Sequence, residues 1–342
     1  MSSNLKIAVV GATGTVGEVI LDILSEHGFK HTQISALASK RSEGNSVNFG
    51  RRELTIQCLD DFDFCSVDYG LFSAGSSISK KYAPLAVAAG CTVIDNSSAF
   101  RLDEAIPLIV PEVNGALLKD FKRPGIIANP NCSTIQMVVA LESIQRKYGI
   151  RRIDVATYQA VSGAGRKAQE ELAKQTMQKM SFQDIECQQF SQQMVFNVLP
   201  QIDVLQENGY SGEEMKMHWE TRKIFSDESI VVNATAVRVP VFFGHAEAIH
   251  LETVSPFELD DVEQLLRAAP GVVYTANLEG GEHPTPAVHA AGEDPVFVGR
   301  LRRDHSRDLG MNLWVVADNI RKGAALNAIQ IMQVLETARA EG

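Results

Sequence analysis

The feature that most constrains the fold of this chain is a strand, a glycine-rich turn and a helix at its N-terminus. Residues 5–10 are largely apolar and β-branched, and apolar residues recur at helical spacing through residues 18–24. Between them, Gly11, Gly14 and Gly17 suit a tight turn and a close approach of the backbone to a pyrophosphate at the helix N-terminus. This segment predicts a dinucleotide-binding loop, although a tight turn without a ligand needs the same glycines.

Further short apolar runs predict more strands in the first half of the chain, and a helical stretch at 83–89 separates two of them. The expected strands are 34–38, 69–73, 92–95 and 126–128. Strands that alternate with helices favour a mostly parallel sheet with crossover connections. We therefore expect a Rossmann-like N-terminal domain in an α/β protein.

The second half of the chain has a different character. Strand-like runs at 153–159, 231–239 and 246–254 predict a mixed or antiparallel sheet. Between the first two runs, the stretch from Gly165 to about Glu220 is rich in Gln, Met, Lys and Glu, which predicts a helical insertion. This half is expected to be an α+β catalytic and dimerisation domain.

The length of 342 residues favours two lobes, because single hydrophobic cores usually stop growing below this size. We expect an NADP-binding domain over residues 1–130 and a catalytic and dimerisation domain over 131–318. The last segment, 319–342, is strongly helical and is expected to pack back on the first domain and complete it.

Composition excludes several classes of function. The formal net charge of -10 provides no global basic field for nucleic acid. No apolar run approaches the roughly 20 residues that span a bilayer, and no signal-peptide pattern is visible, so we expect a cytoplasmic protein without a membrane partner. The five cysteines are odd in number and lack metal-ligand spacing, which argues against a disulfide framework and against a metal site.

The end of the second expected strand carries Ser39-Lys40-Arg41-Ser42, where an NAD enzyme usually has an acidic residue for the ribose hydroxyls. Cations and hydroxyls at this position suit a 2′-phosphate and predict NADP as the cofactor. A solvated basic loop is the alternative. The expected loop residues around the cofactor are Gly11, Thr13, Gly14, Thr15, Val16, Gly17, Ser39, Lys40, Arg41 and Ser42.

Cys132 is the candidate nucleophile, because it stands where a strand gives way to an apolar helix. The N–H groups of a helix N-terminus stabilise a thiolate, and the neighbouring Asn131 and Ser133 add hydrogen-bonding groups without negative charge. The other four cysteines are expected to be small apolar residues without a catalytic role.

Arg238 and His245 lie close together at the end of one expected strand and the start of the next. A guanidinium can bind a carboxylate with two hydrogen bonds, and an imidazole can exchange protons near neutral pH. By composition alone, either side chain is equally compatible with a structural role.

Three motifs make the pattern specific. They are Asn129-Pro-Asn-Cys-Ser-Thr, Tyr158-Gln-Ala-Val-Ser-Gly-Ala-Gly and Arg238-Val-Pro-Val-x-x-Gly-His, and they follow the N-terminal glycine turn in this order. With them, the chain resembles aspartate-semialdehyde dehydrogenase from about residue 5 to 335. The insertion over Gln169–Trp219 resembles the branch of the family that uses a helical subdomain in dimer contacts.

The resemblance implies a role for each matching residue. Cys132 is the acyl-forming nucleophile, Gln159 orients it and binds substrate, and His245 is the acid and base. Arg238 binds the substrate carboxylate, and Glu220 faces the substrate amino group. The phosphate would be held by Arg101, Asn131 and Lys216, and the nicotinamide end of the cofactor would lie along Ser162, Gly163 and Asn319. Lys216 as an ordinary exposed lysine and Asn319 as a helix cap remain alternatives.

The implied reaction is the NADPH-dependent reductive dephosphorylation of L-aspartyl 4-phosphate to L-aspartate 4-semialdehyde through a cysteine thioester. It serves the biosynthesis of lysine, threonine and methionine, with phosphate and a small molecule as ligands and a homodimer or a dimer of dimers as the assembly. The alternatives are N-acetyl-gamma-glutamyl-phosphate reductase, whose substrate lacks a free amino group, and a noncatalytic NADP-binding homologue.

Overall fold

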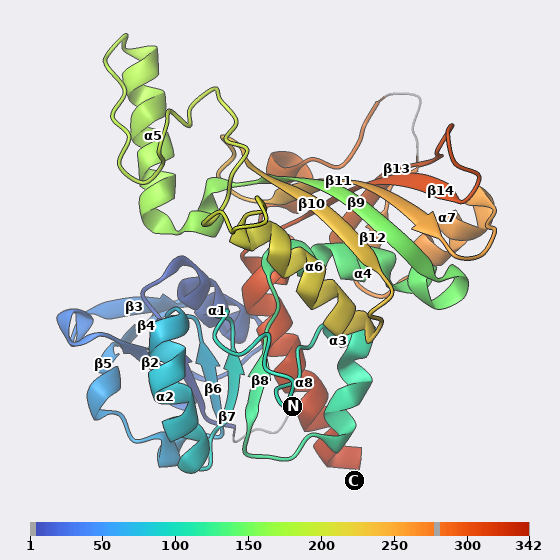
Figure 1. Ribbon diagram of the computed structural model, residues 1–342. Coiled ribbons are helices and arrows are strands. Elements are labelled where there is room, and N and C mark those ends of the chain that lie inside the picture. The colour runs from blue at the N-terminus through green and yellow to red at the C-terminus, as the bar shows by residue number, and fades with distance from the viewer. Residues whose placement is uncertain (1–4, 277–280, 342) are drawn as a thin grey trace. The chain divides into compact units, whose positions relative to one another are not determined.

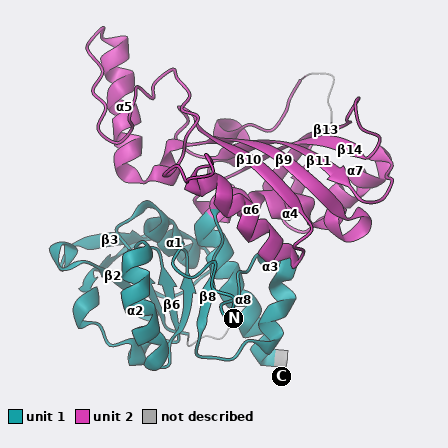
Figure 2. Cartoon of the chain, viewed as in Figure 1, with its two compact units in different colours: residues 1–131, 324–342 teal, residues 132–323 magenta. Residues whose placement is uncertain are grey.

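The chain forms two compact units, each with its own six-stranded sheet (Figure 1). The computed structural model describes residues 5–276 and 281–341. Unit 1 contains residues 1–131 and 324–342, and unit 2 contains residues 132–323 (Figure 2).

The sheet of unit 1 is parallel throughout. In sheet order its strands are β5 (Gln57–Cys58), β2 (Ile34–Ala38), β1 (Ile7–Val10), β6 (Tyr69–Phe72), β7 (Thr92–Asp95) and β8 (Ile126–Ala128). The chain moves from β1 to one side of the sheet and later returns to the other side of β1, so the strand order reverses there. In open α/β sheets, ligands bind beyond the carboxyl ends of the strands at such a point.

Helices cover both faces of this sheet, so β1 is buried on both sides. Ile7 and Val9 pack in a core with residues of α1 (Thr15–Glu26) and α8 (Leu326–Glu341), whereas Ala8 and Val10 pack in a core with residues of α2 (Ser76–Ala88). The unit also contains α3 (Pro111–Asn114), the hairpin strands β3 (Ser46–Phe49) and β4 (Arg52–Thr55), and the 3-10 turns η1 (His31–Gln33), η2 (Lys40–Ser42), η3 (Leu59–Asp61), η4 (Phe64–Ser66) and η5 (Gly115–Asp120).

The glycine turn after β1 has a backbone that other residues would strain. Gly11 has a φ of 88°, a left-handed conformation that favours glycine. A Cβ on Gly17 would lie 2.1 Å from the carbonyl oxygen of Gly11, so the first turn of α1 packs directly on the loop. The corresponding Cβ on Gly14 would meet that oxygen at 3.4 Å. Gly11 and Gly17 are therefore structural requirements of the turn itself.

The sheet of unit 2 is mixed. In sheet order its strands are β10 (Val231–Arg238), β9 (Ile150–Gln159), β11 (His245–Thr253), β14 (Gly310–Ala317), β13 (Val296–Arg303) and β12 (Val272–Tyr274). Its helices are α4 (Cys132–Tyr148), α5 (Arg166–Met180), α6 (Gly212–Phe225) and α7 (Leu259–Ala268), with the 3-10 turn η6 (Val161–Ala164) and the π-helical turns η7 (Pro286–Ala290) and η8 (Arg321–Ala325).

Alternation along the central strands gives this sheet two different faces. On β9, residues Ile153, Val155, Thr157 and Gln159 are buried, whereas Asp154 and its alternate neighbours are only half-buried or exposed. The buried face is covered by α4, which contacts β9, β11, β13 and β14. The polar residues of the unit therefore divide into those beneath α4 and those on the open face.

Most of the expected elements are confirmed. The strands over 34–38, 92–95 and 126–128 have the predicted bounds, and β9, β10 and β11 differ from their predictions by a few residues. The insertion is helical at its two ends, in α5 and α6, but residues 181–211 between them contain turns and isolated bridges. The hairpin of β3 and β4 and the strands β12, β13 and β14 were not predicted, because their apolar alternation is short or interrupted by charged residues.

The return of the chain to unit 1 occurs at Ala324 rather than at Asn319. Asn319 accepts a hydrogen bond from the backbone N–H of Gly244 at 2.9 Å, and its side chain lies 3.0 Å from the Ser162 hydroxyl. These contacts tie the segment before η8 to unit 2.

Candidate active site

Three of the expected site residues form a row at one edge of the unit 2 sheet. Arg238 ends β10, Gln159 ends the parallel strand β9, and His245 begins the antiparallel strand β11. The register pairs Arg238 with Gln159, and the pairing of Ala246 with Tyr158 brings His245 level with Gln159. All three side chains lie on the face that α4 covers, and all are buried.

Cys132 is the first residue of α4. Its side chain is partly exposed, whereas Ser133 and Thr134 are fully buried. A Cβ on Gly323 would lie 2.8 Å from the Cβ of Cys132, so the backbone of η8 packs directly against the start of α4. The thiol thus stands at a helix N-terminus, where the helix dipole favours its ionised form.

Gln159 connects the row to the residues around it. Its Nε2 donates to the Ser133 hydroxyl at 2.9 Å, to the Thr157 hydroxyl at 3.2 Å and to a Glu213 carboxylate oxygen at 3.3 Å. A side-chain amide with its donors engaged in this way has a fixed orientation. The fixed amide lies beside the first turn of α4, which begins with Cys132.

His245 has one ring nitrogen engaged and one directed into the site. The backbone N–H of Ala160 donates to Nδ1 at 3.0 Å, so in the neutral ring the proton lies on Nε2. Nε2 is buried and has no protein hydrogen-bond partner, and a Cβ on Gly163 would lie 3.3 Å from it. Burial, and then the positive charge of Arg238, hold the pKa of His245 well below its usual value.

Arg238 is held by a backbone acceptor on the neighbouring strand. Its Nη1 donates to the carbonyl oxygen of Ala160 at 2.8 Å. Burial lowers the pKa of Arg238, and the negative charges of Glu213 and of the Cys132 thiolate oppose that shift. The guanidinium, the thiol and one carboxylate are therefore within electrostatic reach of one another.

Helix α6 carries three of the acidic and basic groups near this row. Glu213 contacts Gln159, as described above, and its other oxygen lies 3.2 Å from the Nζ of Lys216. Lys216 also donates to Asp203 at 2.8 Å, and these two carboxylates raise its pKa against the effect of burial. Glu220 is buried on the same face of the helix, two turns after Glu213.

The remaining expected site residues of unit 2 are Ser162, Gly163 and Asn319. Ser162 lies in η6, and its backbone N–H donates to the carbonyl oxygen of Phe242 at 3.2 Å. A Cβ on Gly163 would lie 3.0 Å from the Arg238 guanidinium, so a larger residue there would crowd the row. Asn319 links Ser162 to Gly244 through its side chain.

The remaining expected substrate residues lie in unit 1. Arg101 follows β7, is buried, and donates from Nη2 to the carbonyl oxygen of Asn96 at 2.9 Å. Asn131 is buried in the short segment between β8 and α4. Asn129 belongs to the same sequence motif, and the sequence alone indicated no role for it. Its side-chain amide donates to Asn96 at 2.6 Å and accepts from Asn327 of α8 at 2.6 Å.

The expected cofactor residues of unit 1 lie at the carboxyl end of β1, at the point where the strand order reverses. Gly14 is the N-cap of α1, which begins at Thr15. In η2, Lys40 forms ion pairs with Glu43 at 2.8 Å and with Asp61 at 3.6 Å. Arg41 is exposed and takes part in none of the ion pairs found among the described residues. Within this basic loop, Arg41 is the cation without a neighbouring carboxylate.

Known proteins resemble this chain over nearly its whole length. Residues 6–121 match the model for the NAD binding domain of semialdehyde dehydrogenases, and residues 141–322 match the model for their dimerisation domain. The aspartate-semialdehyde dehydrogenase of Shewanella sp. (strain DB6705) is 54% identical, over 98% of both chains. That of Legionella pneumophila is 54% identical, over 98% of this chain and 97% of the relative. The chain belongs to the aspartate-semialdehyde dehydrogenase family.

The fold is also that of solved aspartate-semialdehyde dehydrogenases. The structure of aspartate semialdehyde dehydrogenase II from Vibrio cholerae, complexed with ASA, has a TM-score of 0.94 and 50% identity over 98% of both chains. The parallel sheet of unit 1 and the mixed sheet of unit 2 are thus the two domains of this family.

Over residues 5–276 and 281–341, no helix combines the length and the apolar character that a membrane crossing requires. In the same residues, no cluster of three or more His, Cys, Asp or Glu side chains is arranged to hold a metal ion.

We predict that His245 stays neutral well below pH 6.5 and carries its proton on Nε2. Histidine-labelled ¹⁵N NMR spectra, with the signal assigned through His245→Gln, would report both the tautomer and the pKa. Arg238→Met should raise this pKa, because it removes the nearby positive charge while leaving most of the burial. Arg222→Met, which changes a guanidinium that does not affect His245, is the matched control. An imidazolium signal persisting above pH 6.5 in the wild type would contradict the prediction.

Proposed function

We propose that this chain converts L-aspartyl 4-phosphate to L-aspartate 4-semialdehyde and phosphate, with NADPH as reductant and Cys132 as nucleophile. The observation that carries the proposal is the row of Arg238, Gln159 and His245 beneath the helix that begins with Cys132, in a chain that matches a family member over 98% of its length.

The substrate carboxylate would bind to Arg238, whose guanidinium is buried and fixed by the carbonyl of Ala160. Glu213 is better supported than Glu220 as the partner of the substrate ammonium group. Its carboxylate contacts Gln159 and lies within electrostatic reach of Arg238, whereas Glu220 lies two turns further along α6. Lys216 and Arg101 would meet the phosphate, and Lys216 would then exchange a carboxylate partner for a phosphate oxygen.

In the first step, the Cys132 sulfur attacks the acyl carbon, the bond from that carbon to the phosphate oxygen breaks, and a thioester remains. The negative charge that develops on the carbonyl oxygen needs a donor, and the Nε2–H of neutral His245 is the donor that this tautomer provides. NADPH, when bound, supplies the hydride that reduces the thioester. Release of the aldehyde returns the sulfur to its thiolate form.

The residues of unit 1 fit an NADP molecule on structural grounds. Side chains are excluded at Gly11 and Gly17, which keeps the backbone of the turn open at the start of α1. This turn lies at the strand-order reversal, where dinucleotides bind in such sheets. The pyrophosphate would lie against residues 11–17, and the 2′-phosphate against Ser39, Arg41 and Ser42.

An acidic residue beside Gln159 also separates this proposal from N-acetyl-gamma-glutamyl-phosphate reductase. A free ammonium group can add an ion pair with the buried carboxylate of Glu213, whereas an acetylated nitrogen carries no charge and cannot form one. A noncatalytic homologue would have no chemical need for an arginine, an amide and an imidazole aligned in one row.

The central test is NADP reduction by the purified protein with aspartate semialdehyde and phosphate. The wild type should be active, and Cys132→Ala should retain less than about 1% of the turnover while binding NADP normally. Cys65→Ala and Cys187→Ala, which change exposed thiols, are the controls and should remain active. Activity of Cys132→Ala above a few per cent would exclude the thioester route. Activity with the N-acetylglutamate semialdehyde instead would favour the alternative reductase.

Cofactor preference provides a second test. Arg41→Ala should weaken NADPH binding about tenfold and NADH binding little, because one charged hydrogen bond to the 2′-phosphate is lost. Lys40→Ala should have a smaller effect, since Glu43 and Asp61 already neutralise that cation. Binding is measured by calorimetry with each cofactor. Equal losses for NADPH and NADH would show that η2 does not contact the phosphate.

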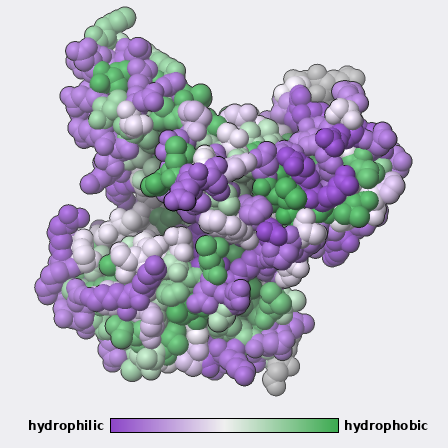
Figure 3. Space-filling view, in the orientation of Figure 1, coloured by the Kyte–Doolittle hydropathy of each residue, from purple (hydrophilic) through white to green (hydrophobic). Residues whose placement is uncertain are grey.

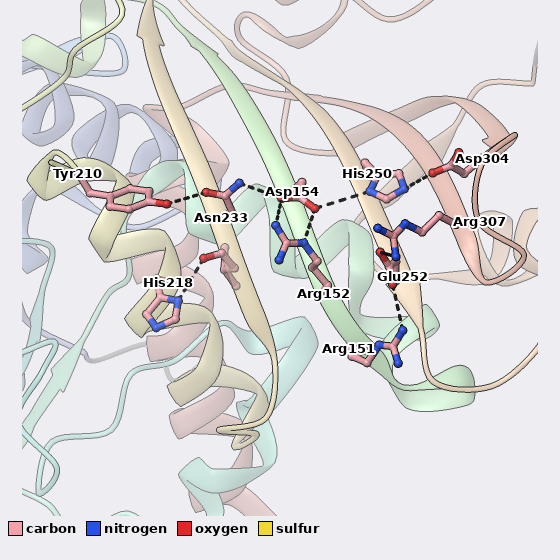
Figure 4. A network of polar contacts seen from close by, with 11 residues as sticks. Arg151, Arg152, Asp154, Tyr210, His218, Asn233, His250, Glu252, Asp304 and Arg307 are labelled. Carbon is pink, nitrogen blue, oxygen red and sulfur yellow. Dashed lines mark hydrogen bonds and ion pairs between the residues drawn. The ribbon is translucent and has the colours of Figure 1, made fainter. Parts of the chain in front are cut away.

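We also propose that two copies associate through the open face of the unit 2 sheet. This face carries a chain of polar contacts from Tyr210 through Asn233, Asp154 and His250 to Asp304, flanked by arginines (Figure 4). The face presents both signs of charge, so two copies related by a two-fold axis can match each other. It also carries the aromatic pair Tyr158 and Trp314, with ring centroids 5.7 Å apart. Aromatic residues are enriched at such interfaces.

Helix α5 provides a further apolar surface in the same unit. Met177 and Met180 are exposed on it, and Phe182, two residues after its end, is 99% exposed. Apolar patches interrupt the hydrophilic surface around α5 in Figure 3. Such residues are typical of surfaces that become covered in an assembly.

Ala248→Arg tests the proposed dimer, because Ala248 lies on the open face between Ala156 of β9 and Trp314 of β14. A bulky charge there should convert the dimer to a monomer in sedimentation velocity. Leu85→Arg, at an exposed position of α2, is the control and should leave the dimer intact. A wild type that sediments as a monomer, or an unchanged dimer in Ala248→Arg, would contradict this interface.

A further inference from the structure

Directly behind the site row lies a second pair of polar residues that the proposed reaction does not use. Glu247 of β11 and Gln136 of α4 are both 0% exposed. Both carboxyl oxygens of Glu247 and both amide atoms of Gln136 are buried without a protein hydrogen bond of ordinary geometry. Buried polar groups in this condition are rare and need an explanation.

The two residues lie one step behind the catalytic groups on their respective elements. Gln136 is four residues after Cys132, one helical turn along the same face of α4. Glu247 is two residues after His245, on the same face of β11. Its neighbours across the strands are Thr157 and Val315, and Thr157 in turn accepts from Gln159. The pair therefore joins the helix of the nucleophile to the strand of the imidazole.

The surroundings of Glu247 oppose its ionisation. Burial raises the pKa of Glu247 well above its usual value, and hydrogen bonding by Gln136 opposes that shift only in part. Among the titratable groups of the site, Cys132 begins α4, Arg238 ends β10, His245 begins β11, and Glu213 and Glu220 lie on α6. Burial and the Gln136 hydrogen bond, rather than any of these charges, account for the shift in the pKa of Glu247. A carboxylate without a cation partner in a buried site is more costly than the neutral acid.

We propose that Glu247 is a positioning residue, held as a neutral carboxylic acid that pairs with the Gln136 amide and fixes α4 against β11. The acid O–H donates to the amide oxygen, and the amide N–H₂ donates to the acid carbonyl oxygen. Such a pair satisfies the four orphaned atoms with groups that carry no charge. The nucleophile and the imidazole are thereby held at a constant separation without a charge that would disturb either.

The sign of the pH dependence follows from the raised pKa. The acid form is neutral in the folded protein at pH values where the unfolded chain has already lost its proton. The contribution of Glu247 to stability is therefore full below the unfolded pKa and is lost as the pH rises through the folded pKa. Glu247→Gln keeps the shape and the hydrogen-bonding pattern without this titration.

Infrared spectroscopy tests the protonation state without using activity. The wild type at neutral pH should show the carbonyl stretch of a protonated carboxylic acid, and this band should be absent from Glu247→Gln. The thermal stability of the wild type relative to Glu247→Gln should also fall as the pH rises. Absence of the band would overturn the proposal. Neither measurement depends on the proposed reaction.

Kinetics test the positioning role, which rests on the proposed function. Glu247→Leu should lower kcat at least about tenfold with little change in KM, because a small displacement of the reacting groups has a large effect on rate. Glu247→Gln should restore most of that loss and should remove the alkaline decline in kcat that ionisation of Glu247 causes in the wild type.

Ile249→Ala is the matched control, since Ile249 is buried on the same face of β11, one row further from the site. It should lower stability without moving the pH profile of kcat. If Glu247→Leu lost stability but kept its kcat, or if Glu247→Gln retained the alkaline decline, the positioning role would be wrong. If no variant and no wild type were active on aspartate semialdehyde, the proposed function would fail while the infrared result still decided the state of Glu247.

Discussion

The hydrogen-bonded register of three strands is the constraint on which the site depends. Gln159 lies far from Arg238 and His245 in the sequence, and only the pairing of β10 with β9 and of β9 with β11 sets the three side by side. A shift of any pair by one residue would turn one side chain to the open face, because neighbours on a strand point in opposite directions. The geometry of the row thus resides in the backbone of the sheet.

Burial then determines the charge state of that row. The row has the buried guanidinium of Arg238 and the neutral imidazole of His245, and Gln159 shares the Glu213 carboxylate with Lys216. Water is largely excluded from these groups, so each interaction between them is stronger than it would be at the surface. Two of the expected ligand-binding cations, Lys40 and Lys216, instead have carboxylate partners in the structure.

Much of this arrangement was accessible from the sequence, because its signals are local. The glycine turn, the buried strands of unit 1 and the Asn129-Pro-Asn-Cys motif each lie within a short stretch of chain. The sequence alone assigned no role to Glu213, although its position three residues before Lys216 places the two on one helical face. Its significance depends on the contact with Gln159, which lies 54 residues away in the sequence.

Local sequence patterns predicted neither the burial of Glu247 nor the strands β12, β13 and β14. A glutamate in an alternating strand usually predicts a solvent-facing position, and nothing near Glu247 in the sequence indicates that α4 covers it. The strand β13 contains three arginines in its eight residues, and charged residues of this kind obscure the apolar alternation. Only the packing of distant elements determines which face of such strands is buried.

Unit 1 is built from two separate segments of the chain, and this affects how the chain folds during synthesis. Its core includes Leu326, Ile329, Met332 and Leu335 of α8, which the ribosome makes only after every residue of unit 2. The continuous unit 2 can fold as soon as it emerges, whereas the N-terminal sheet must wait with one face uncovered. Nascent chains that stop before Ala324 would therefore expose apolar strand surface, and chaperones should bind them at the N-terminal unit although it was synthesised first.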